Sequence, residues 1–280
     1  MGQKDKQVTH IQEKPTIIKI IRIYLKKVFV YFMLAYNKKN TKNEWDEKMI
    51  LLGSLVNGVA IIIGSLLGAI LRNISEQMKD TVTKGIGLGV LVLGVQMAFK
   101  TSSFIIILIS LCLGAMLGEL LGLEDKMNQF GLFLEKRYAK PNSNFAEGFI
   151  TASLIFLIGS MGIIGAIESG AAHNHQTLFT KAVMDGFMSI MLTATLGVGV
   201  LFSAVPVFLY QGLIAIFASL MMRYVPKELL DLLMSEISAI GGLMILGIGL
   251  NIMNITKIRV SNYLPGILIL IAIITYQFYF

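Results

Sequence analysis

The chain has 280 residues, of which 55% are hydrophobic and 15% charged, and its mean hydropathy is +0.73. Soluble domains carry about 25% charged residues, so this composition excludes an ordinary soluble protein and predicts an all-α, polytopic membrane protein. The net charge of +7 does not indicate a nucleic-acid partner, because residues 1–48 carry 11 Lys and Arg against 5 Asp and Glu while the remainder is nearly neutral.

Residues 1–48 form a basic N-terminal extension with two open interpretations. The apolar segment Ile17–Tyr36 contains four cations, each of which costs about 2.5–3.5 kcal/mol near the centre of a bilayer. It is therefore a poor span and more typical of an amphipathic helix on the membrane surface. Alternatively, the extension is an incorrectly assigned start, since the first clean apolar run follows Met49 at once.

Residues 49–280 are predicted to be the transmembrane domain. A spanning helix needs about 20 mostly apolar residues, and eight runs approach this length, although the short connection Phe202–Pro206 leaves seven spans open. The longest connection, Glu124–Asn144, is charged and is predicted to be a solvated turn region. The predicted spans are Met49–Leu71, Val82–Phe99, Phe104–Leu121, Phe145–Ile167, Leu178–Phe202, Val205–Met222, Ile237–Asn254 and Leu264–Phe280.

Two parts of this domain resemble each other and predict an internal repeat. Gly58–Arg72 is similar to Gly212–Arg223 with a gap of three residues, and the Gly-rich run Gly85–Gln96 is similar to Gly241–Asn251. Spans one to three thus correspond to spans six to eight. Because corresponding spans lie five apart, the two units cross the membrane in opposite senses, as in the inverted repeats of secondary transporters. Convergent patterning of small apolar residues is the alternative.

Small residues interrupt the predicted span Phe145–Ile167 near its middle, at Gly159, Ser160 and Gly162. Small residues at this spacing usually let helices pack closely. A glycine-rich sequence within a span can also open the helix and expose backbone groups to a substrate or an ion. These residues are therefore candidates for a substrate or ion pathway.

Polar side chains inside apolar runs are further candidates, because they are costly to bury in a membrane. Asn57, Gln96, Tyr210, Gln211 and Asn251 all lie in such runs. Their amide and hydroxyl groups can coordinate a cation or bind a zwitterion. The alternative role is an interhelical hydrogen bond that contributes about 1 kcal/mol.

Asp185 is the strongest carboxylate candidate, because it lies inside a predicted span and Lys181 precedes it by one helical turn. Such a carboxylate can carry a proton or bind a cation, and the alternative is a capped acid at the membrane interface. Glu119, Glu168 and Glu236 lie at or near span ends, where a charge can reach the interface, and are weaker candidates.

No motif indicates a metal, a cofactor or an enzyme. His173 and His175 lie close together, but a zinc site needs three or four ligands, and no cysteine or acid cluster accompanies them. Phosphate-binding, dinucleotide-binding and nucleophile-elbow motifs are absent from the sequence. ATP-driven transport and intramembrane catalysis are therefore not expected.

Several segments together resemble the YdfK/YqgA-like bacterial membrane proteins, a family of unknown function. The resemblance covers about Met49 to Phe280 and implies a plasma-membrane location, but no established activity and therefore no catalytic residues. It also implies a start near Met49, so that residues 1–48 depart from the family pattern. The segments that carry it are Met49–Asn57, Thr151–Phe156, Asp185–Gly186, Thr195–Pro206 and Tyr210–Gly212.

These features favour a secondary transporter or permease for a small solute or ion. The alternative is a non-transporting scaffold that recruits partners through Glu124–Asn144. The expected partners are the lipid bilayer, a small solute or ion, and further copies of the chain, with no nucleic acid.

Overall fold

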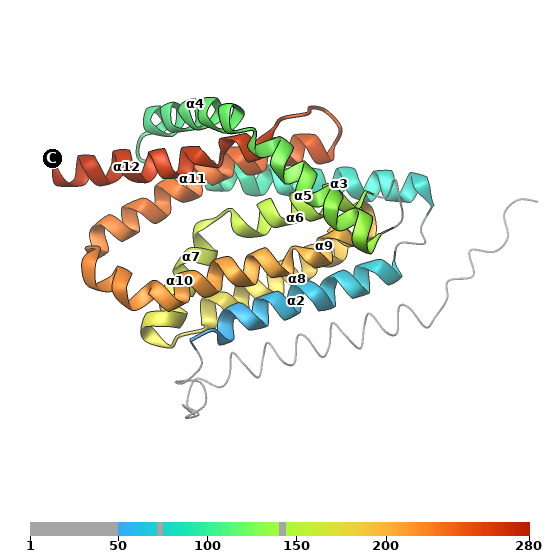
Figure 1. Cartoon of the computed structure of the whole chain (residues 1–280), viewed down its shortest axis with the longest axis horizontal. Helices are drawn as coiled ribbons and strands as arrows, with labels where there is room; N and C mark the ends of the chain where they lie inside the picture. The colour runs from blue at the N-terminus through green and yellow to red at the C-terminus, as the bar shows by residue number, and fades with distance from the viewer. Residues whose placement is uncertain (1–49, 72–74, 140–143) are drawn as a thin grey trace, which may run out of the picture. The chain divides into compact units, whose positions relative to one another are not determined.

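The computed structural model describes residues 50–71, 75–139 and 144–280. These residues form α-helices and one short 3-10 helix, with no strand among them (Figure 1). The helices are α2 (Leu52–Ile70), α3 (Glu76–Ala98), α4 (Phe104–Leu121), α5 (Leu123–Tyr138), α6 (Phe145–Leu157), α7 (Ser160–Ala172), α8 (Gln176–Leu196), α9 (Gly199–Phe202), α10 (Ala204–Tyr224), α11 (Lys227–Ile252), η2 (Val260–Tyr263) and α12 (Pro265–Tyr279). The all-α membrane fold expected from composition is confirmed, whereas the N-terminal extension 1–48 lies outside the described residues.

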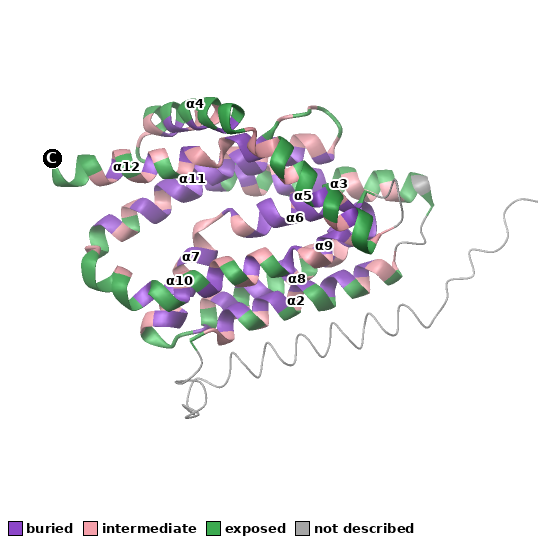
Figure 2. Cartoon of the chain, in the orientation of Figure 1, coloured by how far each residue is buried: buried purple, intermediate pink, exposed green. Residues whose placement is uncertain are grey.

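Six of the described helical segments are long and apolar enough to cross a membrane, and the bent pair α6 and α7 raises the number to seven. The sequence predicted about eight. α8 is long enough to be the eighth, but it carries the hydrophilic residues Lys181 and Asp185 and is not among the six. α4 exposes most of its apolar side chains, whereas 16 of the 26 residues of α11 are buried, so α11 is the more enclosed of the two helices (Figure 2).

The predicted span Phe145–Ile167 is broken in the structure. α6 ends at Leu157, α7 begins at Ser160, and the two helices are bent by 62°. Gly159 has a φ of +132°, a conformation that glycine adopts without the steric cost of a Cβ atom. The mid-span opening anticipated from the glycines is therefore present.

Two connections differ from the sequence prediction. The segment predicted as a solvated turn region is helical from Leu123 to Tyr138 as α5, whose Gly131 packs against Ala146 of α6. The break predicted at Phe202–Pro206 lies earlier, at Gly197, where φ is +95°. α9 and α10 then form one span from Gly199 to Tyr224.

α3 and α11, the predicted matched spans two and seven, contact each other through glycines. A methyl group at Gly94 would lie 2.8 Å from the carbonyl oxygen of Gly242, and one at Gly87 would lie 3.2 Å from that of Gly249. The order of these contacts makes the helices antiparallel, and small residues allow their backbones to approach closely. The inverted repeat itself stays a prediction.

Candidate functional site

A buried polar cluster lies where α2, α8 and α10 meet α7. Asn57 and Gln211 have no exposed surface, and Lys181 and Asp185 are 8% and 7% exposed. The Lys181 ammonium lies 3.0 Å from Oδ1 and 2.8 Å from Oδ2 of Asp185. The Asn57 amide donates to Asp185 Oδ2 at 3.0 Å and to Gln211 Oε1 at 3.1 Å. The cluster therefore joins one ion pair to two side-chain amides.

Close packing of α2 against α8 places Asn57 beside the ion pair. A methyl group at Gly53 would lie 2.6 Å from the side chain of Leu178, and one at Gly64 would lie 2.1 Å from the carbonyl oxygen of Gly186. Glycine at these positions lets the two helices run side by side at short range. Asn57 lies between the two contacts, and its amide reaches the carboxylate on α8.

The chemistry of the cluster fixes the orientation of both amides. An ionised carboxylate only accepts hydrogen bonds, so the Asn57 atom that faces Asp185 is the NH2 nitrogen. The same nitrogen also contacts Gln211, which must therefore present its carbonyl oxygen Oε1. Consequently the NH2 group of Gln211 points away from Asn57.

Two polar atoms of this cluster have no hydrogen-bond partner among the described residues. They are Asn57 Oδ1, an acceptor, and Gln211 Nε2, a donor. The other buried side-chain atoms without partners in that part of the chain are Ser and Thr hydroxyl groups, which rotate freely to suit their surroundings. A buried polar group left unpaired costs about 1–3 kcal/mol, so the cluster has unmet capacity to bind both an acceptor and a donor.

Gly162 brings the broken helix to the cluster. A Cβ atom at this position would lie 3.3 Å from Lys181 Cε and 3.5 Å from Gln211 Nε2. Gly162 is the third residue of α7, so the cluster adjoins the first turn of that helix. The sequence-predicted residues Asn57, Gly162, Asp185 and Gln211 are thus brought together.

Gly159 and Ser160 lie at the break and connect it to α11. The Ser160 hydroxyl is 2.8 Å from that of Ser238, and a methyl group at Gly241 would lie 3.9 Å from the backbone nitrogen of Gly159. Gly159, Ser160 and Met161 are partly exposed. No sequence signal pointed to Ser238, because its hydrogen bond depends on how α7 packs on α11.

The remaining candidates lie elsewhere. Gln96 is exposed on α3, and Tyr210 packs, partly buried, against an apolar cluster that includes residues of α7 and α10. Asn251 accepts from Thr256 and from the backbone of Ile258, and donates to the Ile258 carbonyl oxygen at 2.7 Å. Asn251 therefore holds the turn after α11 and is not part of the cluster.

Glu236 is fully buried among the described residues. Its carboxylate accepts hydrogen bonds from the Thr101 hydroxyl at 2.5 Å, the Ser102 backbone at 2.8 Å and the Ser102 hydroxyl at 2.7 Å. It thus fixes the turn between α3 and α4. Glu168, in contrast, accepts from Thr177 near the end of α7.

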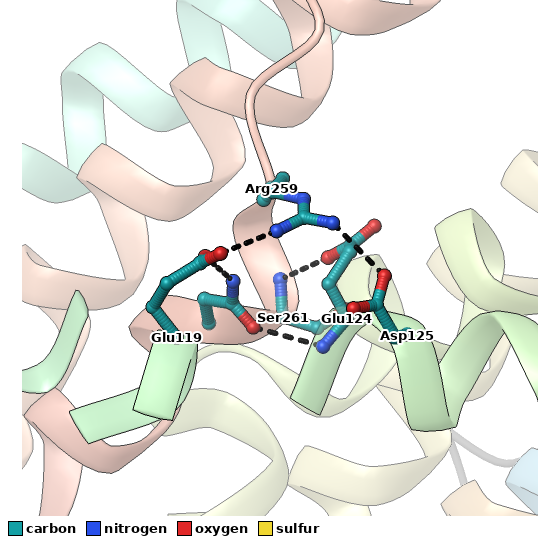
Figure 3. A network of polar contacts seen from close by, with 6 residues as sticks. Glu119, Glu124, Asp125, Arg259 and Ser261 are labelled. Carbon is teal, nitrogen blue, oxygen red and sulfur yellow. Dashed lines mark hydrogen bonds and ion pairs between the residues drawn. The ribbon is translucent and has the colours of Figure 1, made fainter. Parts of the chain in front are cut away.

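A second polar network joins α4 and α5 to the segment before α12 (Figure 3). Arg259 donates to Glu119 at 2.5 Å and to Asp125 at 2.9 Å, and the Ser261 backbone donates to Glu124 at 2.9 Å. Asn262 also donates to Glu119 and accepts from the backbone of Glu124. Because the ion pairs are about half exposed, they act as a surface contact.

Among the described residues, no group of three or more His, Cys, Asp and Glu side chains is placed to hold a metal ion. His175 Nδ1 lies 2.7 Å from the Ser169 hydroxyl, which itself donates to the carbonyl oxygen of Ile50. The pair of histidines seen in the sequence is therefore part of a connection between α7 and α8.

The comparison with known proteins identifies the family. Residues 52–275 match the family described as "Protein of unknown function (DUF554)". The chain belongs to the DUF554 family. It is 34% identical over 224 residues to the uncharacterized membrane protein YdfK of Bacillus subtilis, covering 78% of this chain and 93% of YdfK. It is 27% identical over 226 residues to the uncharacterized protein YqgA of Escherichia coli, covering 79% of this chain and 94% of YqgA.

No solved structure matches this DUF554 chain. The family match includes the four helices that form the buried cluster, so the cluster belongs to the DUF554 domain. Together with the apolar spans, the relatives make the chain a multi-pass bacterial membrane protein. The resemblance inferred from its motifs is confirmed.

Proposed function

We propose that this DUF554 protein is a secondary transporter or permease for a small solute or ion. The observation that carries the proposal is the buried cluster of Asn57, Lys181, Asp185 and Gln211 against the first turn of a broken helix. Ionisable residues within spanning segments are expensive and commonly mark substrate or ion pathways.

The break between α6 and α7 supports the same proposal. Transporters commonly bind their substrates near discontinuous helices, where backbone groups that lack helical partners face the substrate. Here the bend of 62° lies at Gly159, three residues before Gly162, which adjoins the cluster. The residues at the break, Gly159, Ser160 and Met161, are themselves partly exposed.

In this proposal each residue has a separate role. Asp185 exchanges its Lys181 partner for a proton or cation, or shares it with a bound solute. Asn57 and Gln211 supply an acceptor and a donor through their unpaired atoms. Transport requires no covalent step, so we propose neither an enzymatic activity nor a cofactor. The bilayer and further copies of the chain remain the expected partners.

The scaffold alternative has less support from the charged segment on which it depends. Glu124 and Asp125 of α5 are engaged by Ser261 and Arg259 of the same chain. These two carboxylates at the start of α5 therefore bind partners within the same chain, which leaves them less suited to recruit another protein.

Uptake by proteoliposomes tests the proposal. The full chain is reconstituted and assayed with radiolabelled glycine, acetate, sodium and rubidium, against liposomes without protein. We expect protein-dependent uptake of at least one probe, and a reduction of at least tenfold in Asp185→Asn. Asp231→Asn, an exposed carboxylate on α11, is the matched control and should transport normally. Uptake of no probe above protein-free liposomes would count against transport, and unchanged uptake in Asp185→Asn would remove that residue from the mechanism.

A further inference from the structure

The first turn of α7 and two side chains beside it present hydrogen-bond donors or positive charge. Backbone N–H groups in the first turn of a helix have no partner within the helix, and the helix dipole adds positive potential there. No side chain caps this end of α7, since its N-cap residue is Gly159. α7 has 13 residues, so its first turn is part of a substantial helix.

Gln211 points a second donor at this turn. Its Nε2 is fully buried, has no partner among the described residues, and lies 3.5 Å from the position of a Cβ atom on Gly162. Cα–Cβ bonds are tilted toward the N-terminus of a helix, so this position lies beside the first turn of α7. Nε2 is the donor end of this amide because the Asn57 nitrogen that contacts Asp185 also contacts Gln211 Oε1.

Lys181 adds positive charge at the same place. Its Cε lies 3.3 Å from the same Cβ position. A lysine ammonium has three N–H donors, and among the described residues its polar partner is the carboxylate of Asp185. One N–H therefore remains for a further acceptor, while the negative charge of Asp185 is compensated by the ammonium that touches it.

We propose that this DUF554 protein binds the carboxylate group of a small organic acid between Gln211 Nε2, the Lys181 ammonium and the first turn of α7. This inference rests on the proposed transport function and names its substrate class. Three kinds of donor converge there, and a carboxylate is an acceptor with two oxygens. Helix N-termini favour such anions.

Asn57 Oδ1 further limits the class of acid that the proposed site would bind. This acceptor also lacks a partner in the described part of the chain, and it belongs to the amide that contacts Gln211. We therefore extend the proposal to acids that carry a hydrogen-bond donor near the carboxylate, namely an amino or a hydroxyl group, for which this oxygen is the acceptor. Glycine and glycolate carry such a donor on the carbon next to the carboxylate, whereas acetate does not.

Equilibrium binding to the purified full chain in detergent tests the inference, with radiolabelled glycine, glycolate and acetate as probes and ethylammonium, chloride and phosphate as competitors. We expect saturable binding of glycine or glycolate, weaker binding of acetate, and little competition by the other ions. Gly162→Ala places a methyl group against Lys181 and Gln211, and Gln211→Glu replaces the donor with a like charge. Gln211→Glu should bind at least about tenfold more weakly because it loses a hydrogen bond to a charged group, and Gly162→Ala should weaken binding at least as much because its methyl group occupies space beside both donors.

Gly58→Ala is the matched control. It adds the same methyl group one residue from Asn57, where the nearest atom is 3.5 Å away and belongs to Phe208. It should bind as the unmodified chain does. The Ala variants also show that loss of binding is not loss of folding, provided that their helical circular dichroism and thermal midpoints agree.

The outcomes separate this inference from the proposed function. Binding of none of the three acids, or equal binding by Gly162→Ala, Gln211→Glu and Gly58→Ala, overturns the carboxylate site. Transport of sodium or rubidium without acid binding overturns the site and leaves the transporter standing. Acid binding that depends on Gly162 and Gln211 but occurs without uptake in liposomes supports the site and refutes transport.

Discussion

Replacing either member of the Lys181–Asp185 pair singly should destabilise the protein far more than replacing both. The two side chains are only 10% and 9% exposed and lie 2.8 Å apart at the closest atoms. Lys181→Met leaves the carboxylate with the Asn57 amide as its remaining partner among the described residues. Asp185→Asn leaves a buried ammonium facing a neutral amide.

The magnitude follows from the cost of an unpaired buried charge. Removing one member of a buried pair costs about 3–5 kcal/mol, whereas replacing the whole pair by uncharged residues of similar volume is often nearly neutral. We therefore expect each single variant to lose about 3 kcal/mol or more of unfolding free energy. The double variant Lys181→Met with Asp185→Asn should lose less than either single variant, which makes the coupling energy larger than one single-variant loss.

Unfolding in mixed micelles with increasing denaturing detergent, followed by circular dichroism at helical wavelengths, measures these free energies. Lys84→Met is a suitable control, because Lys84 pairs with Asp80 at the same i,i+4 spacing but both side chains are more than half exposed. It should cost well under about 1 kcal/mol. Additive losses in the double variant would refute the argument that the Lys181–Asp185 charges compensate each other within the bundle.

Two further predictions contrast a buried hydrogen-bond network with an exposed one. Glu236→Ala should lose about 3 kcal/mol or more, because it removes three hydrogen bonds to a fully buried carboxylate. Glu228→Ala on the exposed start of α11 should lose less than about 0.5 kcal/mol, and equal losses in the two variants would contradict this. Arg259→Ala should lose only about 0–1 kcal/mol despite its two short ion pairs, because they are half exposed. That small loss should vanish when unfolding is repeated in about 1 M salt, and a loss that persists there would refute the surface assignment.

The helical membrane fold could be predicted from the sequence, because the lipid bilayer requires apolar runs long enough to cross it. Length and apolarity alone do not locate the breaks that backbone geometry introduces into an apolar run. The stretch Phe145–Ile167 is apolar enough for one span, but Gly159 takes a positive φ and divides it. Similarly, the break between α8 and α10 lies at Gly197 and not near Phe202. Gly197 takes a positive φ that ends α8, whereas Pro206 is tolerated in the first turn of α10.

The sequence identified most residues of the buried cluster, but it did not show that they lie together. Burial cost singled out Asn57, Asp185 and Gln211, and helical spacing paired Lys181 with Asp185. The same argument also chose Gln96 and Asn251, because the cost of a polar residue does not say whether its helix turns it inward, outward or toward its own connection. That depends on packing between helices, such as the close approach of α2 and α8 at Gly64, which no local pattern contains.

The unpaired amide of Gln211 is the strongest physical argument that the cluster does more than join helices. If hydrogen bonding between helices were its whole role, the contact of Gln211 Oε1 with Asn57 would satisfy one end and leave the other as a cost of about 1–3 kcal/mol. Apolar residues at both Asn57 and Gln211 would avoid that cost, because replacing both partners of a hydrogen bond by apolar groups of the same shape is often nearly neutral. A ligand that accepts a hydrogen bond from Gln211 Nε2 at the first turn of α7 would remove this cost. The free energy recovered in this way would then contribute to the binding free energy of the ligand.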